Sequence, residues 1–217
     1  MHRFYRLAAT GVFTTLCAMS TAQAQTEKLF QDSWFWGVHA GVTTFGTPAT
    51  SNQSAGSFGA EWMITRSVGG LYLSFDQANF NSTGAIADGS ETSGIRPVSL
   101  HDMRTGSIGA MAFPVRFGNF RPYAGAGFSL SVIGTATARP DIGETSASID
   151  QSVVQNVDNA KSRSAVFLMG GGQWQVNRTA VYGQIMVTPG DDNFLINGAV
   201  TQISVGVRYN FGSSIER

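Results

Sequence analysis

Between Gln202 and Phe211 the closing stretch of the chain alternates apolar residues with polar or small ones. A repeat of two places the apolar side chains on one face of a β-strand and the others on the opposite face. The stretch has the length of a tilted strand that crosses the hydrocarbon core of a bilayer, which takes about 9–11 residues. The pattern therefore predicts a membrane-spanning strand. Its apolar positions are Ile203, Val205, Val207, Tyr209 and Phe211.

Seven earlier stretches alternate in the same way, so the chain is predicted to form eight strands. The phase of the fourth strand stays open, because either Ile108 and Ala110 or Met111 and Phe113 would face lipid. A β-bulge within it would switch the faces midway. The predicted strands cover residues 34–44, 56–64, 71–76, 103–113, 122–133, 164–174, 180–188 and 202–211.

Long and short connections alternate between these strands. The short ones cover residues 65–67, 114–121 and 176–179, and the long ones cover residues 45–55, 79–100, 134–162 and 189–198. Tight periplasmic turns and longer outside loops are typical of outer-membrane barrels. The predicted fold class is all-β: an eight-stranded antiparallel transmembrane up-and-down β-barrel with short periplasmic turns and long extracellular loops. The alternative is a soluble periplasmic lipocalin-like barrel, since periodicity does not say which face points outward.

Composition favours the membrane barrel. Charged residues make up 13% of the chain, about half of the ~25% usual in soluble domains. A water-facing surface normally carries more charge than this. The formal net charge is zero, which argues against nucleic acid as a partner, because no basic excess exists to displace phosphate counterions.

The first residues are typical of a secretory signal. Two arginines precede an apolar core from Leu7 to Met19, and Ala22–Ala24 is a small-x-small cleavage site. These features predict a cleaved signal peptide over residues 1–24 and a single outer-membrane barrel domain over residues 25–217. The one cysteine, Cys17, lies in the signal peptide, so no disulfide or thiolate metal site is expected in the mature chain.

Two stretches carry a family resemblance. Arg121–Phe128, R-P-Y-A-G-A-G-F, resembles the fifth strand of the small OmpA/OmpX-type outer-membrane barrels. Val205–Phe211, V-G-V-R-Y-N-F, resembles the C-terminal signal that the outer-membrane insertion machinery recognises, with Val205, Val207, Tyr209 and Phe211 as its positions. This chain departs from the family by continuing past Phe211 with Gly212–Arg217. The resemblance implies the bacterial outer membrane as the location, and outer-membrane lipid, lipopolysaccharide and the insertion machinery as partners.

Several charged residues fall on the predicted inward faces. The interior of an eight-stranded barrel is just wide enough for side chains, and a lone charge there is costly. We therefore expect a network that links Glu61 and Asp76 to Arg104 or Arg208. The alternative is that these charges lie near the rim in water. His39, also on an inward face, is expected to pack or to form a hydrogen bond.

Candidate chemistry is sparse. Ser99, His101 and Asp102 are the nearest approach to a nucleophile with its base, and the alternative is a solvated loop. No catalytic residue, cofactor or metal site is predicted. The expected function is a non-catalytic structural or surface-interaction role, with loops 79–100 and 134–162 facing a possible extracellular partner. A small passive pore is the alternative, and a lipid A-modifying hydrolase is a more distant one.

Overall fold

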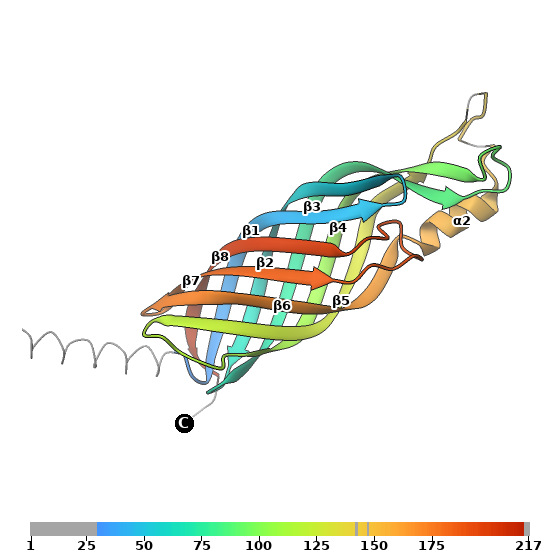
Figure 1. The fold of residues 1–217 in the computed structure, drawn as a ribbon. Coiled ribbons are helices and arrows are strands. Elements are labelled where there is room, and N and C mark those ends of the chain that lie inside the picture. The colour runs from blue at the N-terminus through green and yellow to red at the C-terminus, as the bar shows by residue number, and fades with distance from the viewer. Residues whose placement is uncertain (1–29, 142, 147, 215–217) are drawn as a thin grey trace, which may run out of the picture.

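The structure is a computed structural model that describes residues 30–141, 143–146 and 148–214, so the predicted signal peptide lies outside the described residues. Eight strands form a closed barrel in chain order, and β8 pairs with β1 (Figure 1). Every pairing is antiparallel, which confirms the predicted eight-stranded antiparallel barrel. The elements are β1 (Ser33–Thr47), β2 (Thr50–Thr65), β3 (Gly69–Ala87), β4 (Ile95–Ala112), β5 (Phe120–Ala138), α2 (Gln151–Asn159), β6 (Ser162–Val176), β7 (Thr179–Thr188) and β8 (Val200–Ser213).

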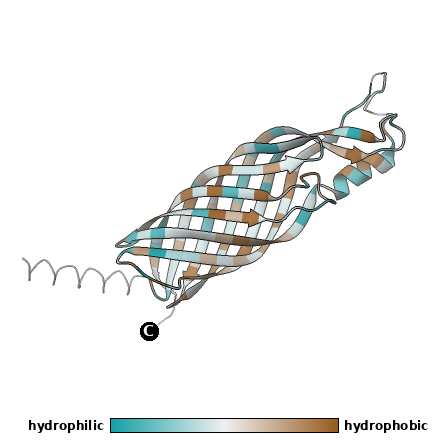
Figure 2. Cartoon of the chain, in the orientation of Figure 1, coloured by the Kyte–Doolittle hydropathy of each residue, from teal (hydrophilic) through white to brown (hydrophobic). Residues whose placement is uncertain are grey.

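The outside of the barrel is apolar. Phe128, Val205 and Phe211 are each about two-thirds exposed, at 66%, 65% and 64% of their surface. Hydrophobic and hydrophilic residues alternate along the strands (Figure 2). A large apolar surface of this kind suits lipid far better than water.

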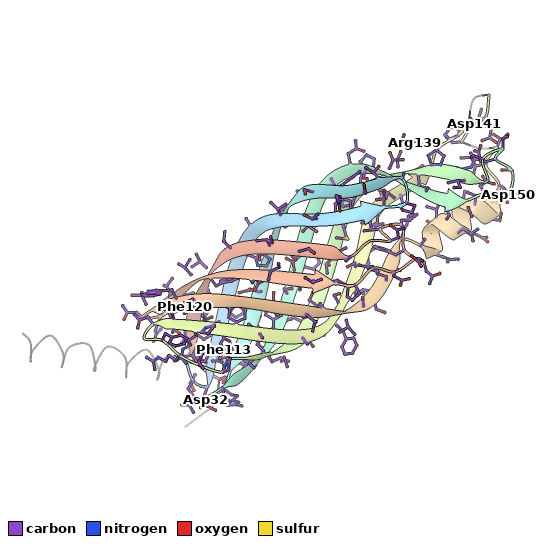
Figure 3. All side chains as sticks on the ribbon, in the orientation of Figure 1. Asp32, Phe113, Phe120, Arg139, Asp141 and Asp150 are labelled. Atoms are coloured by element: carbon purple, nitrogen blue, oxygen red, sulfur yellow. The ribbon has the colours of Figure 1, made fainter. Side chains whose placement is uncertain are left out.

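The two ends of the barrel differ. Asp32, Phe113 and Phe120 mark the end where the strands are joined by short turns and where β8 ends (Figures 1 and 3). Arg139, Asp141 and Asp150 lie beyond the opposite end (Figure 3). We call these the short-turn end and the long-loop end.

The predicted long loops are more regular than expected. β3 continues to Ala87 and β4 begins at Ile95, so most of residues 79–100 form a hairpin that projects past the barrel. β5 likewise continues to Ala138. Many polar residues interrupt the apolar alternation in these segments, although Val98, Leu100, Ala136 and Ala138 are buried there. We call residues 79–100 and 134–162 together the extension.

The extension also contains the helix α2, which is absent from the elements predicted by the sequence pattern. Asp150 caps it by accepting a hydrogen bond from the Ser152 amide at 2.7 Å. Val153 and Val157, one turn apart, are its buried residues. Among the described residues no helix is long and apolar enough to cross a membrane.

The phase of β4 changes along its length. Ile108, Ala110 and Ala112 face outward, whereas Met111 is buried inside the barrel. The inward face switches between Leu100 and Met103, next to Asp102, whose φ of 55° lies in the left-handed region. Aspartate tolerates that conformation better than most residues. The alignment of β4 with β3 also shifts here, between Ala78 and Asn81.

Candidate functional sites: the closed lumen and the extension

A buried ion pair lies inside the barrel between β2 and β8. Glu61 and Arg208 both face Gly37 of β1, one from each side. Because Gly37 has no side chain, the two long side chains meet in front of it; a Cβ there would lie 2.9 Å from Glu61 Oε1. Arg208 Nε donates to Glu61 Oε1, and Arg208 Nη1 donates to Gln173 Oε1 at 2.9 Å. Both charged side chains are at most 1% exposed.

A second buried pair has the same arrangement two residues further along β1. His39 of β1 and Asp76 of β3 flank Gly59 of β2, and His39 Nε2 lies 2.6 Å from Asp76 Oδ1. Asp76 also accepts hydrogen bonds from Gln202 Nε2 at 2.7 Å and from the Ser74 hydroxyl at 2.9 Å. The buried carboxylate is therefore satisfied from three strands.

The two pairs are connected by Tyr182 and by a contact between His39 and Glu61. Tyr182 Oη lies 3.1 Å from His39 Nδ1, and the Arg208 guanidinium stacks on the Tyr182 ring at 3.7 Å. His39 Nδ1 is 4.0 Å from Glu61 Oε2. These groups form one polar layer across the middle of the lumen.

The structure brings together some of the residues proposed for the interior network and separates others. Glu61 meets Arg208, while Asp76 meets His39 instead of an arginine. Arg104 is on the outside of the barrel, so its proposed place in the network is wrong. The reason is the switch of face beside Asp102, which turns Arg104 outward together with Gly106 and Ile108.

Apolar clusters lie toward both ends of the barrel from the polar layer. A cavity of about 20 Å³ beside Asp76 and Gln202 has room for about one water molecule. The long-loop cluster includes Phe45, Val98, Leu100, Ile133, Val153, Val157, Phe194, Leu195 and Ile196. The short-turn cluster consists of Phe30, Phe35, Met63, Tyr72, Met111, Phe113, Tyr123, Phe167, Met169 and Met186.

An ion-pair cluster holds the tip of the extension. Arg96 of β4 is 1% exposed and lies 2.5 Å from Asp88, 3.0 Å from Glu91 and 2.7 Å from Glu144. Hydrogen bonds from Ser90 and from Arg96 lower the pKa of Asp88 to about 2. The Arg96 hydrogen bond also lowers the pKa of Glu144. One buried arginine thus joins the β3–β4 hairpin to the connection that follows β5.

The candidate catalytic residues are not assembled. The Ser99 hydroxyl accepts a hydrogen bond from Arg139 Nε at 2.6 Å, and no interaction between described residues joins it to His101. His101 is exposed, and Asp102 occupies the left-handed turn of β4. Within the described part of the chain, no three His, Cys, Asp or Glu side chains are grouped so that they could hold a metal ion.

The proposed insertion-signal positions form an outward row on β8. Val205, Val207, Tyr209 and Phe211 are between 43% and 65% exposed. Tyr209 and Phe211 pack edge to face, with ring centroids 5.1 Å apart. β8 continues through Gly212 to Ser213, so part of the expected tail belongs to the strand, while residues 215–217 lie outside the described part.

No protein-family model and no curated protein sequence matches the chain. Among solved structures, it is similar to neisserial surface protein A (NspA), with a TM-score of 0.53 and 14% identity over 82% of this chain and 97% of that one. It is also similar to Ail, the attachment invasion locus protein of Yersinia pestis, with a TM-score of 0.50 and 11% identity over 84% of this chain and 100% of that one. The chain therefore has the fold of the small eight-stranded outer-membrane barrels.

Proposed function

We propose that the protein is an integral outer-membrane barrel of the OmpA/OmpX type whose role is structural or surface-interacting, and that it acts through the extension. The observation that carries this proposal is the contrast between a closed lumen and an ordered extension. Two apolar clusters and a buried ion-pair layer lie along the described lumen, and we expect them to obstruct the passage of solutes. In the described part of the extension, by contrast, the Arg96 cluster joins the β3–β4 hairpin to the connection after β5, and α2 packs two valines inward.

The partners follow from this location. Lipid and lipopolysaccharide surround the apolar outside, and the insertion machinery acts on the β8 row that ends at Phe211. The neighbours NspA and Ail are, by their names, a surface protein and an attachment protein. Those names favour a surface role here without assigning one. No nucleic acid is expected, since the formal net charge is zero.

The edge of the extension suits an extended partner segment. Pairing between β2 and β3 ends at Asn79, whereas β3 continues to Ala87. Phe80 to Ala87 contains no charged residue and no proline, the residues that usually prevent an edge strand from pairing with another chain. Among the described residues, the Thr47 hydroxyl donates to the Thr83 carbonyl at 2.7 Å on this edge. Strand addition to the remaining edge positions is the mode of recognition that we infer for an extracellular partner.

Conductance in a planar lipid bilayer tests the closed lumen. The refolded protein should give a silent bilayer, with β-type circular dichroism as the control for folding. Discrete and reproducible current steps would instead make the passive pore the better function.

Orientation and the surface role are tested on intact cells. The Ser146→Cys and Arg178→Cys variants place one thiol in the extension and one in a short turn. A membrane-impermeant maleimide should label the first in intact cells and the second only after permeabilisation. Cells displaying the protein should adhere to a matrix-coated surface better than cells without it, and Arg96→Gln should reduce that adhesion. Equal adhesion with and without the protein would refute the surface-interaction role.

A further inference from the structure

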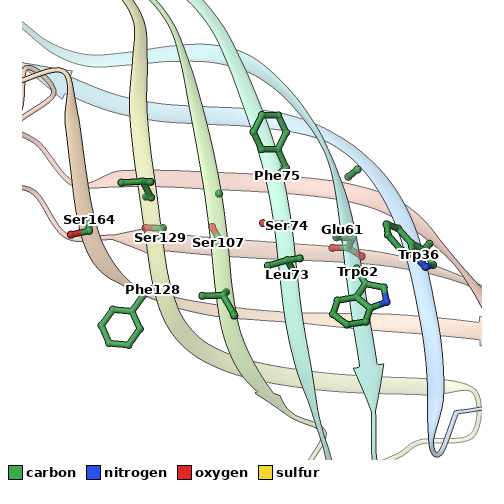
Figure 4. Close-up of a pocket in the computed structure, with 14 residues that line it drawn as sticks. Trp36, Glu61, Trp62, Leu73, Ser74, Phe75, Ser107, Phe128, Ser129 and Ser164 are labelled. Atoms are coloured by element: carbon green, nitrogen blue, oxygen red, sulfur yellow. The ribbon is translucent and has the colours of Figure 1, made fainter. Parts of the chain in front are cut away.

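The outward face of β1–β5 contains an apolar hollow. Its volume is about 630 Å³, within the range of small-ligand pockets, about 300–1,000 Å³. Trp36, Phe75 and Phe128 line it and are more than half exposed, so it opens away from the lumen. Trp36, Trp62, Leu73, Phe75 and Phe128 lie around it in Figure 4. A flat lipid-facing surface would lack such a depression.

Small residues create the floor of the hollow. One row of paired residues crosses four neighbouring strands and consists of Ala60, Phe75, Gly106 and Leu130. Ala60 and Gly106 leave the backbone uncovered between their bulky neighbours. A Cβ added at Gly106 would meet no atom within 4 Å, so this glycine faces open space instead of serving close strand packing.

The positively charged side chain of Arg104 lies at one end of the hollow. Arg104 precedes Gly106 by two residues on the same outward face of β4, a separation of about 7 Å. Its row neighbours are Gln77 and Val132, so it lies where the apolar outside gives way to polar residues. No ion pair or hydrogen bond joins the Arg104 side chain to another described residue. A charge exposed at this boundary is placed to meet an anion at the membrane interface.

We propose that the hollow and Arg104 together bind one molecule of a phosphorylated membrane lipid, lipid A in the proposed outer membrane. The phosphate accepts charge-assisted hydrogen bonds from the Arg104 guanidinium. An acyl chain lies along β4 over Gly106, between Phe75 and Leu130. This inference rests on the proposed membrane location, but it does not depend on what the extension binds. It assigns a role to the one residue that the interior network does not include.

Lipid retention by the full-length refolded protein tests the site. Native mass spectrometry would compare adducts formed with lipid A, with phosphatidylcholine and with inorganic phosphate alone. Gly106→Leu fills the hollow where no backbone atom obstructs it, and Arg104→Gln removes the charge. Each variant should weaken lipid A retention at least about fivefold, a loss comparable to one charge-assisted contact.

Matched variants separate this site from general lipid contact. Gly183→Leu adds the same side chain at another glycine whose Cβ would have space, on β7, away from the hollow. Arg178→Gln removes an exposed charge at the short-turn end. Both should retain lipid A as the unmodified protein does.

Four results would overturn the proposal. One is an equal loss in all four variants, and another is equal retention of phosphatidylcholine. A third is displacement of lipid A by inorganic phosphate to the same extent in the unmodified protein and in Gly106→Leu. Lipid A would then bind through its phosphate alone, without using the hollow. The fourth is a doubled mass in place of lipid adducts, which would make the hollow a contact between barrels. Failure of the protein to float with vesicles would instead refute the membrane location itself.

Discussion

Replacement of Arg208 by methionine should strongly destabilise the barrel. Methionine keeps an unbranched side chain but leaves the Glu61 carboxylate buried without its cation. It also removes the hydrogen bond to Gln173 and the stacking on Tyr182. Removing one partner of a fully buried pair costs about 3–5 kcal/mol, because the remaining charge has lost both water and its counter-charge. His39 offsets only part of this loss, since its Nδ1 lies 4.0 Å from Glu61 Oε2 while its Nε2 is held by Asp76 at 2.6 Å.

Urea unfolding in detergent micelles measures this loss, with the heat-modifiable band on a denaturing gel as the signal. With a slope of about 1–3 kcal/mol per molar urea, the midpoint should fall by at least about 1 M. The double variant Arg208→Met with Glu61→Gln removes both charges, so it should recover about 2 kcal/mol or more relative to the sum of the two single losses.

An exposed arginine provides the control. Arg178→Met, in the turn before β7, should change the free energy of unfolding by no more than about 0.5 kcal/mol. The reasoning would be refuted if Arg208→Met cost less than about 1 kcal/mol. It would equally be refuted if the two single losses simply added in the double variant, because the pair would then not be coupled.

Three further outcomes are expected. Gly127→Val should prevent formation of the folded gel band, because a Cβ there would collide with the backbone of β4, whereas Gly106→Val should fold normally. The folded state favours the Asp88 carboxylate, whose pKa falls from an ordinary 3.8 to about 2. The stability that Asp88 gives the tip is therefore full above about pH 4 and is lost as the pH falls through about 2. Hydrogen exchange at the hairpin turn should accelerate over that interval, after correction for intrinsic rates, and Arg96→Gln should exchange fast throughout. Finally, removal of residues 209–217 should abolish folding, whereas removal of the last four residues should not, and equal folding of both truncations would contradict the closing role of β8.

The barrel strands were predictable because their signal is local. Each strand has one face toward side chains in a narrow lumen and one toward an apolar outside, so the alternation of β8 can be read from Gln202 to Phe211 alone. The extension gave a weaker signal, since the strand residues around Thr83 and its partner Ser99 have few apolar positions, such as Val98 and Leu100, and these lie among polar residues. The helix α2 was missed although Asp150 and the valines at 153 and 157 carry its cap and its spacing.

Arg104 illustrates where the local signal fails. The residues around Arg104 are compatible with either an inward or an outward position for its side chain. The left-handed conformation of Asp102 and the shifted alignment of β4 with β3 decide that it faces outward. A change of one residue in phase moves every following side chain to the other surface. The same shift that removed Arg104 from the lumen brought it to the end of the apolar hollow.

The sequence by itself determined the strand number and placed Glu61, Asp76 and Arg208 opposite the apolar faces of their strands, because a repeat of two depends only on neighbouring positions, but it left the phase of β4 open. The tertiary structure alone decided which charges meet. Glu61 and Arg208 are 147 residues apart and become neighbours through the alignment of β2 and β8 on either side of Gly37. Such an alignment is a property of the closed ring of backbone hydrogen bonds, in which every strand fixes the position of the next.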